Sequence, residues 1–176
     1  MRKILLIFLV IIFSKFSYAE EVYNYSENII HGPFNSKIYE NSRIYFSKPK
    51  NKDNKTFLIL EKGQAKKSPL EVIVDTYETE GSPPKIESAF FYPIKKTVNL
   101  IVILSWSVNS RGIGTYGNLY ETRFYKDEGG CLKRNLDFQA LKETTGFDGY
   151  QEGEEVSFNL KTASAVKKFI NENISK

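Results

Sequence analysis

The sequence holds a single cysteine, Cys131, and a single histidine, His31, among its 176 residues. A lone cysteine cannot close an internal disulfide, so no covalent link is expected to support the fold. Zinc sites use cysteine and histidine side chains that recur at short spacing, and neither recurs here, so we expect no metal. Serine or cysteine catalysis needs a base, and His31 lies in the turn sequence NIIHGPF, where an exposed or capping role is expected.

Cys131 itself lies in the stretch EGGCLKRN and has three possible roles. It could be a small buried apolar side chain, one half of an intermolecular disulfide, or a nucleophile. Burial is favoured because free cysteine is among the most frequently buried residue types. A nucleophilic role would require a base that the sequence does not place nearby.

Long apolar runs are almost absent, since only Ile4–Phe13 qualifies, and it is too short for a membrane-spanning helix, which needs about 20 residues. The run follows a basic start and precedes the small residues Ser17 and Ala19, which is the order found in secretory signal peptides. We therefore predict that residues 1–19 are cleaved and that the mature protein begins at Glu20. The expected compartment is the periplasm of a Gram-negative bacterium.

The chain also lacks a strong excess of charge of one sign. It has 25 basic and 21 acidic residues, and loss of the predicted signal peptide lowers the formal net charge from +4 to +1. Nucleic-acid-binding domains usually carry a marked basic excess, so we expect no nucleic-acid partner. Residues 20–176 fit one domain that is long enough to bury a core.

Glycine is patterned in one stretch, RGIGTYG, where Gly112, Gly114 and Gly117 have the G-x-G-x-x-G spacing of nucleotide phosphate loops. The flanking segments 97–108 and 119–126 both alternate with a period of two, which indicates strands. A dinucleotide site needs a helix that starts at the loop, and a kinase loop needs further motifs that this chain lacks. We therefore predict a hairpin connection and no cofactor.

The segment 97–108, TVNLIVILSWSV, is the most distinctive part of the pattern. One face is apolar along its whole length, whereas the other is apolar only at its centre, at Ile101 and Ile103. This predicts a long central strand whose second face is covered at mid-length by a helix. The residues of the fully apolar face are Val98, Leu100, Val102, Leu104, Trp106 and Val108.

Further strands are predicted at 56–60, 70–76, 86–92 and 156–160, and residues 146–155 are predicted to form a turn. The helical spacing of apolar residues after Thr162 predicts an amphipathic C-terminal helix with Thr162 as its N-cap. The sequence therefore predicts a single α+β domain. We expect six to eight mostly antiparallel strands in a twisted sheet or half-open barrel, with the C-terminal helix packed across it.

The C-terminal half of the chain resembles a group of small exported bacterial proteins. The resemblance is carried by LIVILSWSVNSRGIGTYGNLYETRFYKDEG, then GFDGYQEGEEVSF and KTASAVKKFI. Members of the group are encoded beside interbacterial toxins, especially type VI secretion effectors, and are thought to act as periplasmic immunity proteins. The matching residues are Trp106, Gly114, Tyr116, Gly117, Tyr120, Glu121, Tyr125, Phe147, Asp148, Gly149, Lys161 and Lys168.

The resemblance implies a binding protein that neutralises an effector by occluding its active site. We expect residues 109–118 to form the occluding loop, because Arg111 and Tyr116 flank its glycines. Tyrosine and arginine are favoured at the energetic centres of interfaces. The candidate partner-binding residues are Arg111, Ile113, Thr115, Tyr116, Asn118, Asp148 and Tyr150. No catalytic residue is assigned. The alternatives are a cell-envelope hydrolase that uses carboxylates such as Glu121 and Asp148, or a structural envelope protein.

Overall fold

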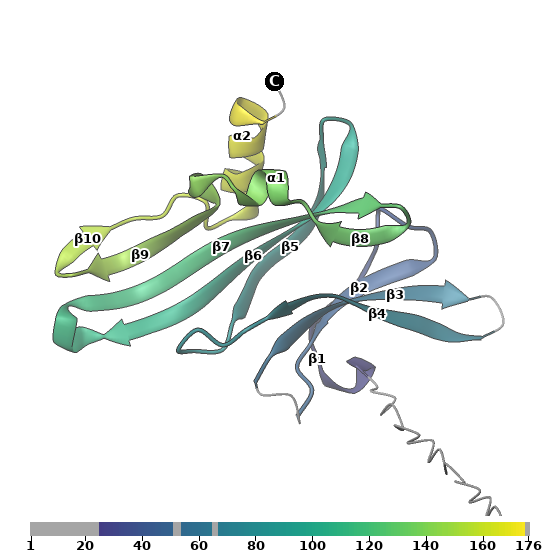
Figure 1. Cartoon of the computed structure of the whole chain (residues 1–176), viewed down its shortest axis with the longest axis horizontal. Helices are drawn as coiled ribbons and strands as arrows, with labels where there is room; N and C mark the ends of the chain where they lie inside the picture. Colours follow the sequence, from purple (N-terminus) through teal and green to yellow (C-terminus); the bar gives the residue numbers. More distant parts are fainter. Residues whose placement is uncertain (1–24, 51–53, 65–66, 175–176) are drawn as a thin grey trace, which may run out of the picture.

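The computed structural model describes residues 25–50, 54–64 and 67–174, which form two facing β-sheets and a C-terminal helix (Figure 1). The predicted signal peptide and the cleavage site before Glu20 lie outside these residues. In the described part of the chain, every helix is too short or too polar to cross a membrane.

Sheet A contains four antiparallel strands, each paired with its neighbour along the chain. A short 3-10 turn, η1 (Tyr25–Asn28), precedes it, and the Tyr25 ring lies 5.6 Å from the Phe57 ring. The turn therefore covers part of the sheet face that points away from sheet B. The strands are β1 (Ile29–Asn35), β2 (Ser42–Ser47), β3 (Thr56–Gln64) and β4 (Lys67–Tyr77).

Sheet B contains six strands in the order β10-β9-β7-β6-β5, with β8 paired to the far end of β7. Its strands are β5 (Lys85–Ile94), β6 (Thr97–Ser110), β7 (Thr115–Glu128), β8 (Cys131–Arg134), β9 (Thr145–Gln151) and β10 (Glu154–Val156). The connecting elements are η2 (Arg111–Ile113), α1 (Leu136–Gln139) and η3 (Lys142–Thr144), and α2 (Ala163–Asn173) ends the fold.

The main core lies between the two sheets. Strand β6 supplies the apolar face that its alternation predicts, and sheet A packs against it with side chains from β2, β3 and β4. This face buries large apolar surface, and such burial is the main favourable term in folding. The core residues are Ile44, Phe46, Leu58, Leu60, Tyr77, Leu100, Val102, Leu104, Trp106, Tyr125 and Leu132.

A second core lies on the opposite face of sheet B, under α2. Ile101 and Ile103 of β6 pack there with Val166 and Ile170 of the helix, which confirms the predicted helix over the centre of this strand. The helix begins as predicted, because the Thr162 side chain accepts a hydrogen bond from the Ala165 amide at 3.2 Å.

The predicted α+β class, the mostly antiparallel pairing and the C-terminal helix are confirmed, but the strand count and the sheet arrangement differ. Among the described residues, ten strands form two separate sheets, rather than six to eight strands in one twisted sheet or half-open barrel. The added strands include β9 and β10, which occupy the stretch 146–155 that the sequence predicts to be a turn, whereas residues 157–160 lie outside any strand.

Two single-residue predictions are also wrong. Cys131 is exposed at the start of β8, beside the Gly129–Gly130 turn, so it is not a buried apolar side chain. His31 is half-buried between the rings of Phe34, at 5.1 Å, and Phe46, at 5.7 Å, and burial lowers its pKa. It therefore packs as an aromatic residue rather than serving as an exposed or capping side chain.

Candidate functional site

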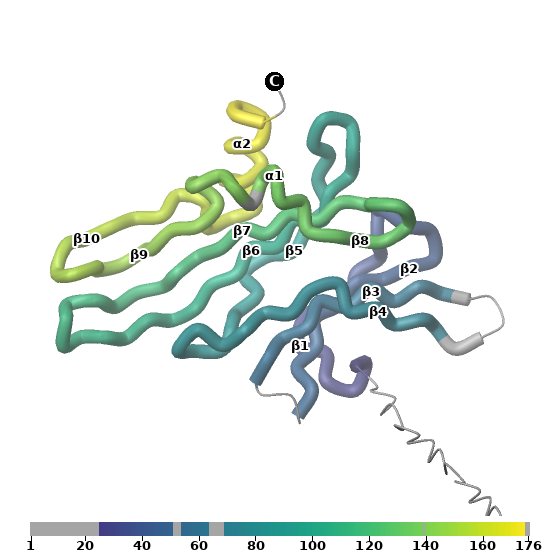
Figure 2. Tube along the Cα trace, in the orientation of Figure 1, coloured from purple at the N-terminus to yellow at the C-terminus, as the bar shows by residue number. Residues whose placement is uncertain are grey.

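Two hairpins of sheet B end side by side at one end of the molecule, as Figure 2 shows. The first joins β6 to β7 through η2, and the second joins β9 to β10. The Gly153 amide donates to the Gly114 carbonyl at 3.0 Å, and the Glu152 amide donates to the Thr115 hydroxyl, also at 3.0 Å. We call residues 109–116 and 150–155 together the double-hairpin tip.

The glycines of the G-x-G-x-x-G stretch allow this close contact. A Cβ on Gly114 would lie 2.8 Å from the Gly153 nitrogen, and a Cβ on Gly117 would lie 2.3 Å from the Asp148 carbonyl oxygen. Both glycines have positive φ, +69° and +153°. The loop connects two antiparallel strands, as predicted, and the glycines at 114 and 117 are explained by the packing of β9 and its hairpin.

A stack of three side chains lies along the tip. The Arg111 guanidinium lies 4.7 Å from the centre of the Tyr116 ring, and Tyr116 stacks on Tyr150 with ring centres 5.0 Å apart and planes 18° apart. The two tyrosines are cross-strand partners in the register of β7 and β9. Ile113, two residues after Arg111 in η2, has 69% of its surface exposed. An arginine, two tyrosines and an exposed isoleucine therefore form one preformed surface.

Asp148 has a different role from the predicted one. Its carboxylate accepts hydrogen bonds from the Lys161 ammonium at 2.6 Å, the Phe158 amide at 3.2 Å and the Ser157 hydroxyl at 3.3 Å. The Lys161 contact, opposed by desolvation and assisted by the Phe158 amide, lowers the pKa of Asp148. Asp148 thus ties the segment that leads to α2 onto β9.

The structure therefore divides the seven candidate residues into three groups. Arg111, Ile113, Tyr116 and Tyr150 lie together at the tip. Thr115 and Asp148 are used in internal hydrogen bonds. Asn118 lies opposite Asp148 in the register of β7 and β9 and lines a separate cavity along the sheet.

A cluster of charged and phenolic side chains between the sheets was missed by the sequence reasoning. The Arg123 guanidinium bonds Asp75 at 3.0 Å and Glu121 at 2.9 Å, and it lies 4.9 Å from the centre of the Tyr77 ring. The Tyr125 hydroxyl donates to Asp75 at 2.6 Å and shares a 2.9 Å hydrogen bond with Tyr77. We call these five residues the interior charge cluster.

Burial controls the acid–base behaviour of this cluster. It raises the pKa values of Tyr77 and Tyr125, so both remain protonated at neutral pH. Burial alone would lower the pKa of Arg123, but the hydrogen bond and ion pair with Glu121 outweigh it, and the pKa is raised. The ion pair between Arg123 on β7 and Asp75 on β4 therefore links the edge of sheet A to sheet B.

The two carboxylates of the hydrolase alternative do not face each other. Glu121 points into the interior charge cluster and also bonds Arg134 at 3.4 Å, whereas Asp148 bonds Lys161 on the other face of sheet B. The strand register explains this separation. Asp148 is paired with Asn118, so both side chains lie on the same face of sheet B. Glu121 is an odd number of positions from Asn118 along β7, so its side chain lies on the opposite face. Glycosidase-type chemistry needs paired carboxylates across one substrate.

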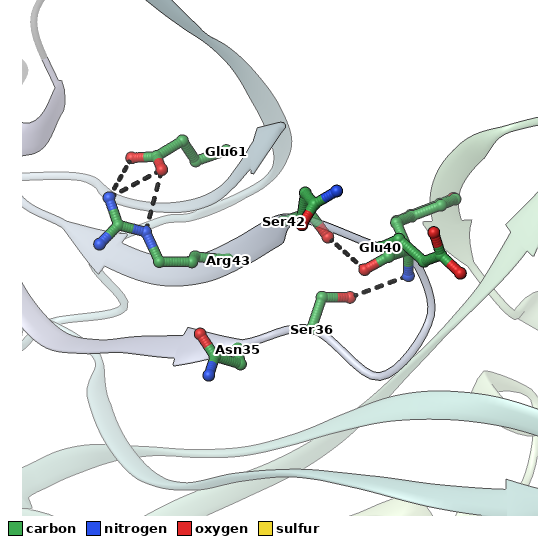
Figure 3. Close-up of a pocket in the computed structure, with 8 residues that line it drawn as sticks. Asn35, Ser36, Glu40, Ser42, Arg43 and Glu61 are labelled. Carbon is green, nitrogen blue, oxygen red and sulfur yellow. Dashed lines mark hydrogen bonds and ion pairs between the residues drawn. The ribbon is translucent and has the colours of Figure 1, made fainter. Parts of the chain in front are cut away.

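A polar cavity of about 420 Å³ lies between the β1–β2 turn and β3 (Figure 3). Arg43 and Glu61 point toward each other there and make three hydrogen bonds of 2.7 to 3.0 Å. Ser36 accepts from the Ile38 and Tyr39 amides, and Ser42 donates to the Tyr39 carbonyl. Most of its polar groups thus already hold the turn in shape.

Within residues 25–50, 54–64 and 67–174, no three histidine, cysteine, aspartate or glutamate side chains gather in a metal-binding arrangement. Comparisons of this chain with known protein families, with curated proteins and with solved structures found no match.

Proposed function

We propose that this protein is an exported binding protein of the immunity type, which neutralises a toxic effector protein by covering its active site with the double-hairpin tip. The observation that supports the proposal most is the stack of Arg111, Tyr116 and Tyr150 beside the exposed Ile113. Arginine and tyrosine are the side chains that most often dominate interface energies.

The construction of the tip favours binding in a second way. Both hairpins belong to one continuous sheet and are joined by the hydrogen bond from Gly153 to Gly114. Their side chains are already stacked, so little conformational entropy remains to be lost when a partner binds. A rigid protruding surface of this kind suits insertion into a concave site on another protein.

The proposal is tested with the mature protein and the effector encoded beside its gene. We expect a stable complex and loss of effector toxicity when the two are mixed. Changing Arg111→Ala together with Tyr116→Ala should weaken binding by well over 1 kcal/mol, that is, by more than about fivefold in Kd, as measured by calorimetry.

A matched control uses a second cation and tyrosine pair on the surface of sheet B. Lys167 of α2 lies 5.7 Å from the centre of the Tyr92 ring on β5, in the part of sheet B that α2 covers. Lys167→Ala with Tyr92→Ala should leave affinity unchanged. Absence of a complex with the wild-type protein would overturn the proposed function, whereas full affinity in the Arg111 and Tyr116 variant would overturn the role of the tip.

A further inference from the structure

We propose a second binding site, independent of the proposed function, that takes a neutral saccharide on the outer face of sheet B. A cavity of about 380 Å³ lies there, between the β4–β5 turn and strands β5, β6 and β7. Its floor includes Ser105 and Ser107, which continue the face of β6 that carries Ile101 and Ile103 under α2. The cavity volume falls in the range of small-molecule sites.

The charged groups of this cavity neutralise each other. The Lys85 ammonium lies 3.0 Å from the Glu87 carboxylate, and the Ser105 hydroxyl donates to the same carboxylate oxygen at 2.7 Å. The Glu87 side chain is only 22% exposed, so these contacts hold it in one position. A charged ligand would have to separate this pair, whereas a neutral ligand can use the lone pairs that remain on the carboxylate.

Several polar groups in the cavity have no hydrogen-bond partner in the described part of the chain. The Ser82 hydroxyl is buried without a hydrogen bond. Among the described residues, no hydrogen bond joins the side chains of Ser107, Asn118 or Tyr120 to another residue. The side chains of Ser107, Asn118 and Tyr120 therefore keep hydrogen-bonding groups that a ligand can satisfy, whereas the Ser82 hydroxyl lies below the accessible surface.

The unpaired groups define the chemistry of the ligand. Hydroxyls and a carboxamide both donate and accept hydrogen bonds, and the carboxylate of Glu87 accepts, so the complement is a molecule rich in hydroxyl groups. A phosphate would need a free cation, and the only cation among the described lining residues is the paired Lys85. Pro83 is the only aliphatic side chain among these lining residues, which is too little apolar surface to receive a peptide side chain. A sugar ring meets all three conditions.

The aromatic wall of the cavity is held in place from behind. Tyr120 stacks on Phe158, with ring centres 5.7 Å apart and planes 23° apart. Phe158 in turn lies over Gly146, where a Cβ would approach its ring to 2.2 Å. The Asp148 bonds to residues 157–161 fix this segment, so Tyr120 offers its hydroxyl from a fixed position next to Asn118.

The site is tested by titrating the mature, isotope-labelled protein with cellobiose, maltose and N,N′-diacetylchitobiose and recording amide shifts by NMR. We expect saturable shifts at residues 85–87, 105–107 and 118–120 with at least one disaccharide, at a Kd of about 1 mM, since the cavity is open and its two charges are paired with each other. Asn118→Ala and Ser107→Ala should each raise that Kd about fivefold.

Asn35→Ala is the matched control for Asn118→Ala, because it removes the same kind of side chain from a different cavity, the one shown in Figure 3. It should leave sugar binding unchanged, and so should the double change at Arg111 and Tyr116. The absence of shifts in the cavity with all three disaccharides would overturn the proposal. Shifts with the zwitterion glycylglycine but not with the sugars would also overturn it, and neither result bears on the effector complex. The spectra themselves report whether each variant is folded.

Discussion

Replacing Gly117 with alanine should lower the free energy of unfolding by about 2–6 kcal/mol. The backbone φ of +153° is a conformation that alanine adopts at a cost of about 1–3 kcal/mol. The new Cβ would lie 2.3 Å from the Asp148 carbonyl oxygen and 2.9 Å from the Gly149 Cα, so β7 and β9 must separate. Overpacking of this kind typically costs a further 1–3 kcal/mol, roughly.

Urea unfolding followed by circular dichroism measures this loss, and Gly112→Ala is the matched control from the same loop. A Cβ on Gly112 meets no atom within 4 Å, so its stability should change by less than about 0.5 kcal/mol. In a thermal scan, the Gly117 variant should melt about 4–24 °C lower than wild type. Equal stability of the two variants would refute the explanation that the packing of β7 on β9 requires glycine at position 117.

Arg123→Ala should destabilise the protein by about 3 kcal/mol, because it removes the closer cation from the mostly buried carboxylates of Asp75 and Glu121 and leaves them only Arg134, at 3.9 and 3.4 Å. Lys168→Ala, from an exposed pair at 4.0 Å, should cost less than about 0.5 kcal/mol in the same urea assay. The folded state lowers the pKa of Asp148, so the ionised carboxylate adds to stability at pH values above its unfolded pKa of about 3.9. This contribution is lost as the pH falls through the lower pKa of the folded state. In Asp148→Asn, the free energy of unfolding should therefore fall less steeply as the pH is lowered. An unchanged pH dependence would contradict the ion pair between Asp148 and Lys161. Cys131 should react with Ellman's reagent at one thiol per chain without denaturant, and reaction only after unfolding would contradict its exposure.

The parts of the fold that the sequence predicts best are those whose pattern is local. Strand β6 is apolar on one face throughout and on the other only at its centre, so alternation alone indicates a strand, its direction of burial and the helix above it. The helix α2 is similarly marked by its spacing and its Thr162 cap. The hairpin at RGIGTYG follows because both neighbours are strands.

The parts that sequence reasoning missed depend on partners far along the chain. Strands β9 and β10 are rich in glycine and glutamate, and β9 forms because Gly149 fits against Gly117 in β7. Arg123 and Asp75 are 48 residues apart, so nothing near Arg123 signals its second ion pair, although its pairing with a nearby glutamate is predictable from the strand.

The sequence predicts those contacts of the candidate site that are local in the chain, and it misses those that depend on distant segments. Arg111 and Tyr116 are close in sequence and belong to one hairpin, so their proximity is a local property. The contact of Tyr116 with Tyr150 depends on the register of β7 and β9. The use of Asp148 as a tie depends on the path of residues 157–161, which carries no periodic pattern.

Strand β6 belongs to both cores, and every residue from Asn99 to Trp106 is buried. Sheet A cannot detach without uncovering one side of this strand, and α2 cannot detach without uncovering the other. Loss of either layer therefore weakens the support of the remaining one. We expect the layers to melt together in a single cooperative transition, with no stable fragment left after a cut that separates residues 25–77 from the rest.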